Sequence, residues 1–381
     1  MMRAHVSKPD FKSLKATLFA AAAVIAIAVP ASADHIKQVN LVTDDQSVNA
    51  AQITDPNLVN AWGMSYSPTS PLWVSDNGTG VATVYRINPA TNATTKLGLT
   101  VTIPGDGSVN GEAWNGNSGA FNGDAFLFTS EDGTISGWRG SLGTTAQTLQ
   151  AGSTTNLYKG MTLTSVGGHS YLLAANFGTG SIDVLKGDVS APNLAGAFTD
   201  PSLPAGYHPF NVQQLNGHVF VTYALNTGAH DESHGAGQGF VSEFDASGNF
   251  IARVGSQGDL NAPWGLAIAP ASFAGIGGDL LVGNFGDGRI NIFDPVTDKF
   301  LGQLIGASGS PLSIDGLWGL IVGNGGSGGN PNELYFSAGP GDEGHGLLGA
   351  LSFVPEPATM FLFAAGLLGF AARRRRAGTT A

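Results

Sequence analysis

Short apolar runs separated by glycine-rich polar turns recur along this chain. The clearest copy runs from Asn261 to Gly306 and reads NAPWGLAIAP, then GDLLVGNFGDGRINIFDPVTDKFLGQLIG. Within it, Ile290 and Ile292 alternate with Arg289 and Asn291, which is the period of two expected for a strand. The segment NAWGMSYSPTSPLWVSDNGTGVATVYRINPATNATTKLGL matches it almost element by element. Each copy therefore predicts a sheet with room for four short strands.

Six such units can be aligned on one anchor residue each. The anchors are Trp62, Trp114, Met161, Phe210, Trp264 and Trp318, spaced 47 to 54 residues apart. Six units of about fifty residues predict an all-β, six-bladed β-propeller. Two stacked β-sandwiches would leave this period unexplained.

The last unit lacks a fourth strand. It offers an inner strand near Leu317–Val322, a second at Glu333–Ser337 and a third at Leu347–Phe353. The segment His35–Thr43 (HIKQVNLVT) has the character of a strand but belongs to no unit. We expect it to complete the last blade and so close the ring, because closure removes an open sheet edge.

The N-terminus has the pattern of a signal peptide. Basic residues precede the apolar run Ala16–Val29, and Ala31-Ser32-Ala33 offers small residues for cleavage by signal peptidase. The alternative is a membrane anchor, although the apolar run is shorter than the ~20 residues of a spanning helix. The sequence thus predicts a signal peptide at residues 1–33, a propeller at 34–353 and a sorting segment at 354–381.

The C-terminal segment reads VPEPATMFLFAAGLLGFAARRRR from Val354 to Arg376. Its apolar run, Ala358–Ala372, is about 22 Å long as a helix, too short for a permanent span. The arginines that follow favour a cytoplasmic C-terminal end, with the body outside.

This tail closely resembles the PEP-CTERM sorting signal of Gram-negative bacteria. The residues that carry the resemblance are Pro355, Glu356, Pro357, Arg373, Arg374, Arg375 and Arg376. The resemblance implies transient membrane association through the helix and cleavage near the PEP motif by an exosortase-type transpeptidase, commonly in bacteria that build exopolysaccharide. It places the body at the cell envelope or outside the cell. The alternative is a tail anchor that is never cut.

Charge and composition narrow the partners. Without the two ends the body carries nine basic against 26 acidic residues, a net charge of about −17. Such a surface repels nucleic acid and favours cations or neutral ligands. The 56 glycines fit a turn-rich β protein, and the absence of cysteine excludes disulfides and a thiol nucleophile.

Two loops in equivalent blade positions have nearly the same sequence, DESHG at Asp231–Gly235 and DEGHG at Asp342–Gly346. Together with a neighbouring histidine they give the candidate metal ligands His230, Asp231, Glu232, His234, Asp342, Glu343 and His345. Carboxylates with imidazole suit a transition metal, and carboxylates with backbone carbonyls suit Ca²⁺. The alternative is a pair of solvated loops inherited by blade duplication.

A second candidate site lies where the inner strands begin. Its residues are Asn60, Trp62, Asn261, Trp264, Asp315 and Trp318. Tryptophan faces and amide groups can stack on and hydrogen-bond to sugar rings. Alternatively, one aromatic per blade wedges adjacent blades together.

The body also resembles six-bladed propellers of the NHL-repeat and gluconolactonase-like kind, through PWGLAI, LLVGNFGDGRI and NIFD in the fifth unit. This resemblance implies the fold rather than a function, because propellers host many activities. It would also imply a Glu, an Asn and an Asp on the channel axis of an enzyme, a trio that the sequence does not place. The main hypothesis is an exported propeller that binds carbohydrate or an extracellular matrix partner. The alternatives are a metal-dependent hydrolase or lyase of the lactonase type, and a structural matrix component with an inert channel.

Overall fold

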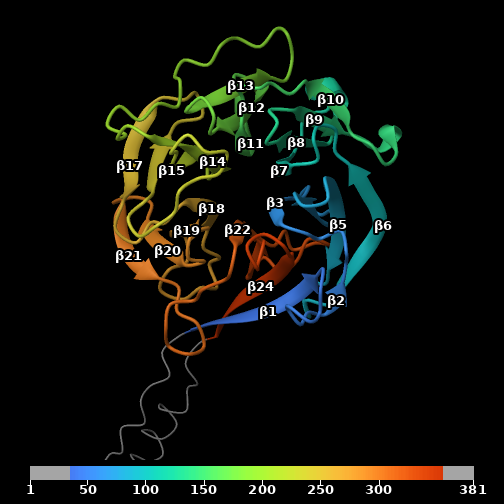
Figure 1. Ribbon diagram of the computed structural model, residues 1–381, viewed down its shortest axis with the longest axis vertical. Helices are drawn as coiled ribbons and strands as arrows, with labels where there is room; N and C mark the ends of the chain where they lie inside the picture. The colour runs from blue at the N-terminus through green and yellow to red at the C-terminus, as the bar shows by residue number, and fades with distance from the viewer. Residues whose placement is uncertain (1–34, 355–381) are drawn as a thin grey trace, which may run out of the picture. The chain divides into compact units, whose positions relative to one another are not determined.

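The computed structural model describes residues 35–354, and in this range six sheets form a ring (Figure 1). The first strands of the six blades contact one another in sequence and finally return to the first, so they line the centre. Between strands the described residues contain two short 3₁₀ turns, Phe121–Gly123 and Gly140–Leu142. The structure confirms the six-bladed β-propeller predicted from the fifty-residue period.

Blades 1, 2, 4 and 5 each contain four antiparallel strands in chain order. Blade 1 has β3 (Ala61–Ser65), β4 (Leu72–Asp76), β5 (Val81–Ile87) and β6 (Thr94–Thr102). Blade 2 has β7 (Val109–Trp114), β8 (Phe126–Ser130), β9 (Ile135–Trp138) and β10 (Gln147–Gln150). Blade 4 has β14 (Tyr207–Leu215), β15 (His218–Leu225), β16 (Phe240–Phe244) and β17 (Phe250–Ser256). Blade 5 has β18 (Pro263–Ile268), β19 (Leu280–Asn284), β20 (Ile290–Asp294) and β21 (Lys299–Gln303).

Blade 3 has three strands, β11 (Tyr158–Val166), β12 (His169–Asn176) and β13 (Ser181–Lys186). The segment that follows β13 crosses to blade 4, where Phe198 packs edge-on against Phe244. This segment contains Pro192, Pro201 and Pro204. Proline lacks the backbone N–H that a strand ladder needs, so no fourth strand forms here.

Blade 6 combines both ends of the described chain. Its strands are β22 (Leu317–Val322), β23 (Leu334–Ala338), β24 (Leu347–Val354), β1 (His35–Thr43) and β2 (Ile53–Thr54). β1 pairs antiparallel with β24 from His35 opposite Val354 to Thr43 opposite Leu347. The predicted closure by the N-terminal strand is confirmed, and β24 extends one residue beyond the predicted Phe353.

Every inner strand carries a β-bulge near its start. The ladder slips between Ala61 and Met64, Val109 and Glu112, Tyr158 and Gly160, Pro209 and Asn211, Pro263 and Gly265, and Leu317 and Leu320. A bulge bends the strand and re-aims a side chain. The residues in this position are Trp62, Asn110, Lys159, Phe210, Trp264 and Trp318.

This register corrects two of the six sequence anchors. Trp114 and Met161, large apolar residues near glycine, are the predicted anchors of the second and third units. In the structure Trp114 ends β7 and is 36% exposed, whereas Asn110 and Lys159 occupy the bulge position in blades 2 and 3. What repeats is the backbone bulge, and the side chain within it varies.

Four of the bulge residues meet at the centre of the ring. The rings of Trp62 and Trp318 stack with centroids 3.5 Å apart, and Trp264 meets Trp62 edge-on at 6.1 Å. Phe210 lies against Trp318, and Phe285 stacks on the same ring at 4.0 Å. These five aromatic side chains fill the middle of the channel, and together we call them the plug. Polar loops cover one end of the plug.

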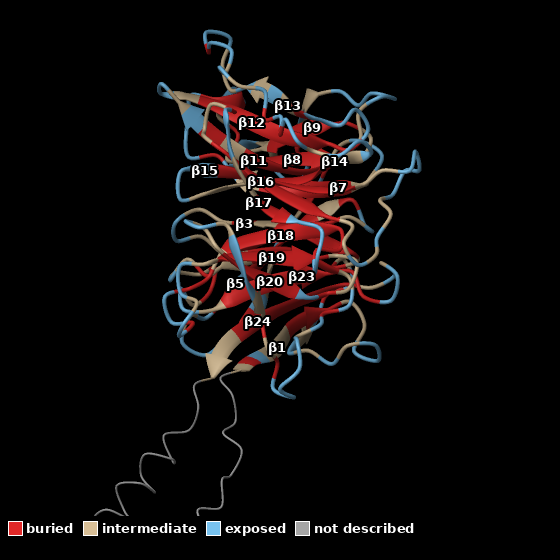
Figure 2. Cartoon of the chain, turned by 90° about the vertical axis from the view of Figure 1, so that its left-hand side faces the viewer, coloured by how far each residue is buried: buried red, intermediate tan, exposed pale blue. Residues whose placement is uncertain are grey.

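Burial follows the strands and exposure follows the loops (Figure 2). Among residues 35–354, no helix has the length and apolar character needed to cross a bilayer. The predicted signal peptide and C-terminal sorting helix lie outside the described residues.

Candidate functional site

A group of ionisable residues gathers at one end of the channel. It comprises Glu131, Lys159, His230, Asp231, Glu232 and Glu343, which we call the channel-mouth cluster. Lys159 comes from the bulge of β11. The other five come from the loops that join the second and third strands of blades 2, 4 and 6. The common fold of the blades thus brings residues more than 200 positions apart to one place.

Lys159 is the centre of this cluster. Its side chain is 1% exposed, and its Nζ lies 2.5 Å from Glu131 Oε1 and 3.2 Å from Asp231 Oδ1. The same ammonium group lies 5.5 Å from the centroid of the Trp62 ring. Burial alone would lower the pKa of Lys159, but the carboxylates of Glu131, Glu232 and Asp231 outweigh it and raise the pKa. The lysine is therefore a buried, charged group.

Asn60 holds the carboxyl group of Glu343 on the other side of the mouth. The Asn60 amide donates to Glu343 Oε2 at 2.6 Å, and its Oδ1 accepts from Trp318 Nε1 at 2.9 Å. Asn60 also donates to Asn77 Oδ1, and Asn77 donates to Glu131 Oε2 at 3.4 Å. A chain of hydrogen bonds thus links Glu343 to the partner of Lys159.

The carboxyl groups of the cluster titrate differently. Burial raises the pKa of Glu343 to about 7, with the hydrogen bond from Asn60 opposing and the charge of Glu232 adding to the shift. Burial also raises the pKa of Glu232, although Lys159 opposes it. For Asp231, burial is outweighed by Lys159 and His230, and the pKa falls. Groups with opposed shifts in one cleft are typical of sites that exchange protons.

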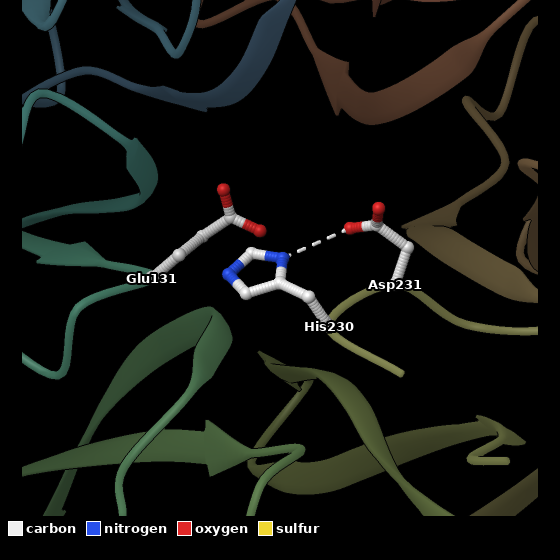
Figure 3. Close-up of side chains that lie close together, drawn as sticks. All are labelled: Glu131, His230 and Asp231. Atoms are coloured by element: carbon white, nitrogen blue, oxygen red, sulfur yellow. Dashed lines mark hydrogen bonds and ion pairs between the residues drawn. The ribbon is translucent and has the colours of Figure 1, made fainter. Parts of the chain in front are cut away.

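His230 lies between two carboxylates (Figure 3). Its Nδ1 is 3.1 Å from Asp231 Oδ1, and one ligand atom each of Glu131, His230 and Asp231 falls within 4.8 Å of the others. Glu131 is not among the residues predicted from the sequence, because its loop, SEDGT, does not share the pattern of DESHG. Its equivalent position between the second and third strands was the signal that could have identified it.

A cavity of about 930 Å³ adjoins the cluster. Glu131 and His230 form part of its wall, together with residues 152–157, Asn226 and His208. His208 Nδ1 lies 2.6 Å from the carbonyl oxygen of Phe177, a contact in which a protonated Nδ1 donates a hydrogen bond. The wall is rich in hydroxyl, amide and imidazole groups, which suits a ligand with many hydroxyl groups.

The other predicted metal ligands are divided between two surroundings. Glu232 and Glu343, from loops two blades apart, interact electrostatically across the mouth. His234 instead lies edge-on to Phe285, and His345 Nδ1 is 2.9 Å from Asp44 Oδ2. Asp342 is exposed. The structure thus brings His230, Asp231, Glu232 and Glu343 to the mouth and leaves the other three outside the cluster.

The residues of the second predicted site, where the inner strands begin, support the channel mouth. Trp62, Trp264 and Trp318 are buried and pack on one another, with 1%, 5% and 0% of each exposed. Asn261 Oδ1 accepts from the backbone N–H of Gly235 at 2.7 Å, and Asp315 Oδ2 accepts from Gly341 at 2.9 Å. In this arrangement the tryptophans form the plug, while Asn60, Asn261 and Asp315 hold the loops above it.

Comparison with known proteins agrees with the architecture and the tail. Residues 353–376 match the family described as the PEP-CTERM protein-sorting motif. The protein is thus a six-bladed β-propeller with a C-terminal motif that implies export and exosortase-type processing, as the sequence predicted.

The protein is 30% identical over 344 residues to the uncharacterized protein L690 of Acanthamoeba polyphaga mimivirus, a match covering 82% of this chain and 85% of the viral protein. The chain belongs to the family of that protein. The uncharacterized protein R648 of the same virus is 28% identical over 342 residues, covering 82% and 80%.

Solved structures resemble the fold at low sequence identity. An α-L-arabinofuranosidase of Fusarium graminearum, in complex with an iminosugar inhibitor, has 11% identity and a TM-score of 0.51, covering 82% of this chain and 96% of that one. A PQQ-bound aldose sugar dehydrogenase of Streptomyces coelicolor has 15% identity and a TM-score of 0.49, covering 84% and 99%. The first similarity shows a shared propeller fold and no more.

Proposed function

We propose that this exported propeller binds a carbohydrate ligand at the channel mouth, at the cell envelope or outside the cell. The observation that carries the proposal is the cavity of about 930 Å³ beside Glu131 and His230. Its polar wall offers both donors and acceptors, the combination that fixes hydroxyl groups in a pocket. Because the tryptophans are buried in the plug, recognition rests on hydrogen bonds in place of stacking.

Charge restricts the ligand to neutral or amine-bearing sugars. The channel-mouth cluster has four carboxyl groups and one lysine, and the body of the protein is strongly acidic. A uronic acid or a sulfated sugar would enter against this negative potential. A neutral or amino sugar meets no such barrier.

A metal-dependent hydrolase or lyase is the second candidate. The mutual approach of Glu131, His230 and Asp231 favours it, and a carboxyl group with a pKa of about 7 suits a general acid or base. Lys159 already contacts two of these three residues. The third candidate, a structural matrix component, needs no ligand at the mouth.

Glycan-array screening followed by calorimetry tests the main proposal. We expect neutral or amino sugars to bind, and His230→Ala to weaken binding at least about tenfold, the equivalent of ~1.4 kcal/mol. His169→Ala is the matched control, because His169 also pairs with an aspartate, Asp188, but lies outside the cavity wall. A silent array favours the structural role, and binding unchanged by His230→Ala locates the ligand elsewhere.

Sorting has its own test. Mass spectrometry of the exported protein should show an N-terminus near Asp34 and the loss of residues after the PEP motif. A chain that still ends at Ala381 would contradict cleavage and favour an uncut anchor.

A further inference from the structure

Lys159 occupies a position that the fold reserves for an inward-facing side chain. In blades 1, 4, 5 and 6 the same bulge carries Trp62, Phe210, Trp264 and Trp318, all buried at the centre of the ring. Lys159 is equally buried, and its own carbonyl oxygen accepts a hydrogen bond from Trp264 Nε1 at 2.7 Å. The lysine is therefore directed into the channel by the backbone and fixed there by a neighbouring indole.

The surroundings of its ammonium group resemble those of a bound ion. Oxygens of Glu131 and Asp231, from two different blades, lie at 2.5 and 3.2 Å, and the face of Trp62 lies on a further side. Glu232 adds a third negative charge nearby. Ca²⁺ binds carboxylate oxygens at about 2.3–2.6 Å, so a similar set of oxygens serves either cation.

A divalent ion and the lysine cannot share this position. Glu131 and Asp231 are two of the three residues whose ligand atoms come within 4.8 Å of one another, and both already contact Nζ. An ion bound there would stand within a few ångströms of an ammonium group with the same sign of charge. Because the lysine side chain is only 1% exposed, the repulsion between the two cations is stronger there than in water.

We propose that the ammonium group of Lys159 is the resident cation of the channel mouth, and that removing it converts Glu131, His230 and Asp231 into a divalent-cation site. The natural protein then needs no metal at this position. This inference does not depend on the carbohydrate ligand. It competes directly with the metal-dependent enzyme.

Lys159→Met tests the proposal, because methionine keeps much of the apolar stem and lacks the charge. Trp62 provides an optical readout, since an ion that replaces Nζ lies close enough to an indole to give sensitised Tb³⁺ luminescence. We expect the wild type to show no saturable Ca²⁺ or Tb³⁺ site below about 1 mM. Lys159→Met should bind at least about 100-fold more tightly, within the range of protein Ca²⁺ sites. Calorimetry with Ca²⁺ alone checks the stoichiometry of one ion.

Two control variants sharpen the result. Lys159→Arg keeps a cation and should gain no site, and Glu131→Gln added to Lys159→Met should remove the site again. A folded Lys159→Met variant that binds no divalent ion overturns the proposal. So does a wild-type protein that binds one ion stoichiometrically and loses affinity on Glu131→Gln.

Failure of Lys159→Met to fold still gives an answer. Folding restored by millimolar Ca²⁺ supports the proposal, because the ion then replaces the missing charge. If Lys159→Met stays unfolded both with and without Ca²⁺, the proposal is tested on the wild type, by measuring its unfolding midpoint with and without chelator. An unfolding midpoint that chelator leaves unchanged supports an internal cation, and a midpoint that chelator lowers overturns it.

Discussion

Glu343 is the residue at which burial most clearly changes the chemistry of the mouth. Its folded pKa of about 7 lies above the value of 4.5 for an unperturbed carboxyl group. Between about pH 4.5 and pH 7, Glu343 therefore keeps its proton in the folded state, whereas the same group in the unfolded chain has lost it. The resulting stabilisation is complete below about pH 4.5 and is lost as the pH rises through 7.

Glu343→Gln should remove this pH dependence, since glutamine is neutral and still accepts from Asn60. The variant should match the wild type near pH 5 and exceed it by about 1–2 kcal/mol at pH 8, after allowance for the partial exposure of the group. Urea unfolding of both proteins from pH 5 to 8 measures this difference. Asp342→Asn, an exposed neighbour in the same loop, controls for the loss of one charge. If the free energy of unfolding of the wild type and of Glu343→Gln changed in the same way with pH, the pKa of Glu343 would not be raised by folding.

Residues of the mouth were only partly predictable. His230, Asp231, Glu232 and Glu343 were found because two loops repeat the same letters. Glu131 and Lys159 were not found, since a lysine in a sequence such as NLYKGM normally reaches solvent. Only the bulge in β11 directs Lys159 inward. Tertiary geometry thus determines the charge at the centre of the site.

At the scale of the element, the inner-strand bulge explains why glycine follows it in most blades. A Cβ added to Gly63 would lie 2.5 Å from the carbonyl oxygen of Asn110, and one added to Gly265 would lie 2.6 Å from that of Trp318. Both obstacles are backbone atoms of the next blade. The inner strands therefore approach so closely that a methyl group must push two blades apart.

Gly63→Ala should accordingly lower the free energy of unfolding by about 1–3 kcal/mol, the usual effect of overpacking. Gly98→Ala is the matched control, because a Cβ there meets no atom within 4 Å. It should be neutral or slightly stabilising, since alanine restricts the unfolded chain. Chemical denaturation of both variants decides the matter, and equal stabilities would mean that the inner strands can separate freely.

Strands were more predictable than bulges. The inner strand of blade 6 was placed at Leu317–Val322, as observed, and its second strand begins one residue later than expected. The missing outer strand of blade 3 was not anticipated, although its prolines were visible. Alternation of apolar residues identifies strands reliably, whereas the position of a bulge depends on the neighbouring blade.

The whole molecule is closed by its N-terminal strand and carries a sorting motif at its C-terminal end. β1 supplies the fourth strand of the last blade, and a clasp reinforces it where Asp44 accepts from Gly346 N at 2.9 Å and pairs with His345. The sorting motif begins where β24 ends. Removal of the tail after Val354 would therefore cost the propeller no strand, while removal of β1 would open the ring.

Two truncated chains test this asymmetry. A chain of residues 34–354 should unfold cooperatively, because all six blades keep their strands. A chain that begins at Asp44 loses the pairing with β24 and exposes a sheet edge, so it should be insoluble or lack a cooperative transition. His345→Ala, which keeps β1 but loosens the clasp, should lie between them. Thermal unfolding followed by circular dichroism compares the three. An unchanged midpoint in the chain that begins at Asp44 would mean that the ring is stable without its closing strand. The propeller would then tolerate the loss of either end, which contradicts the expected difference between the two truncations.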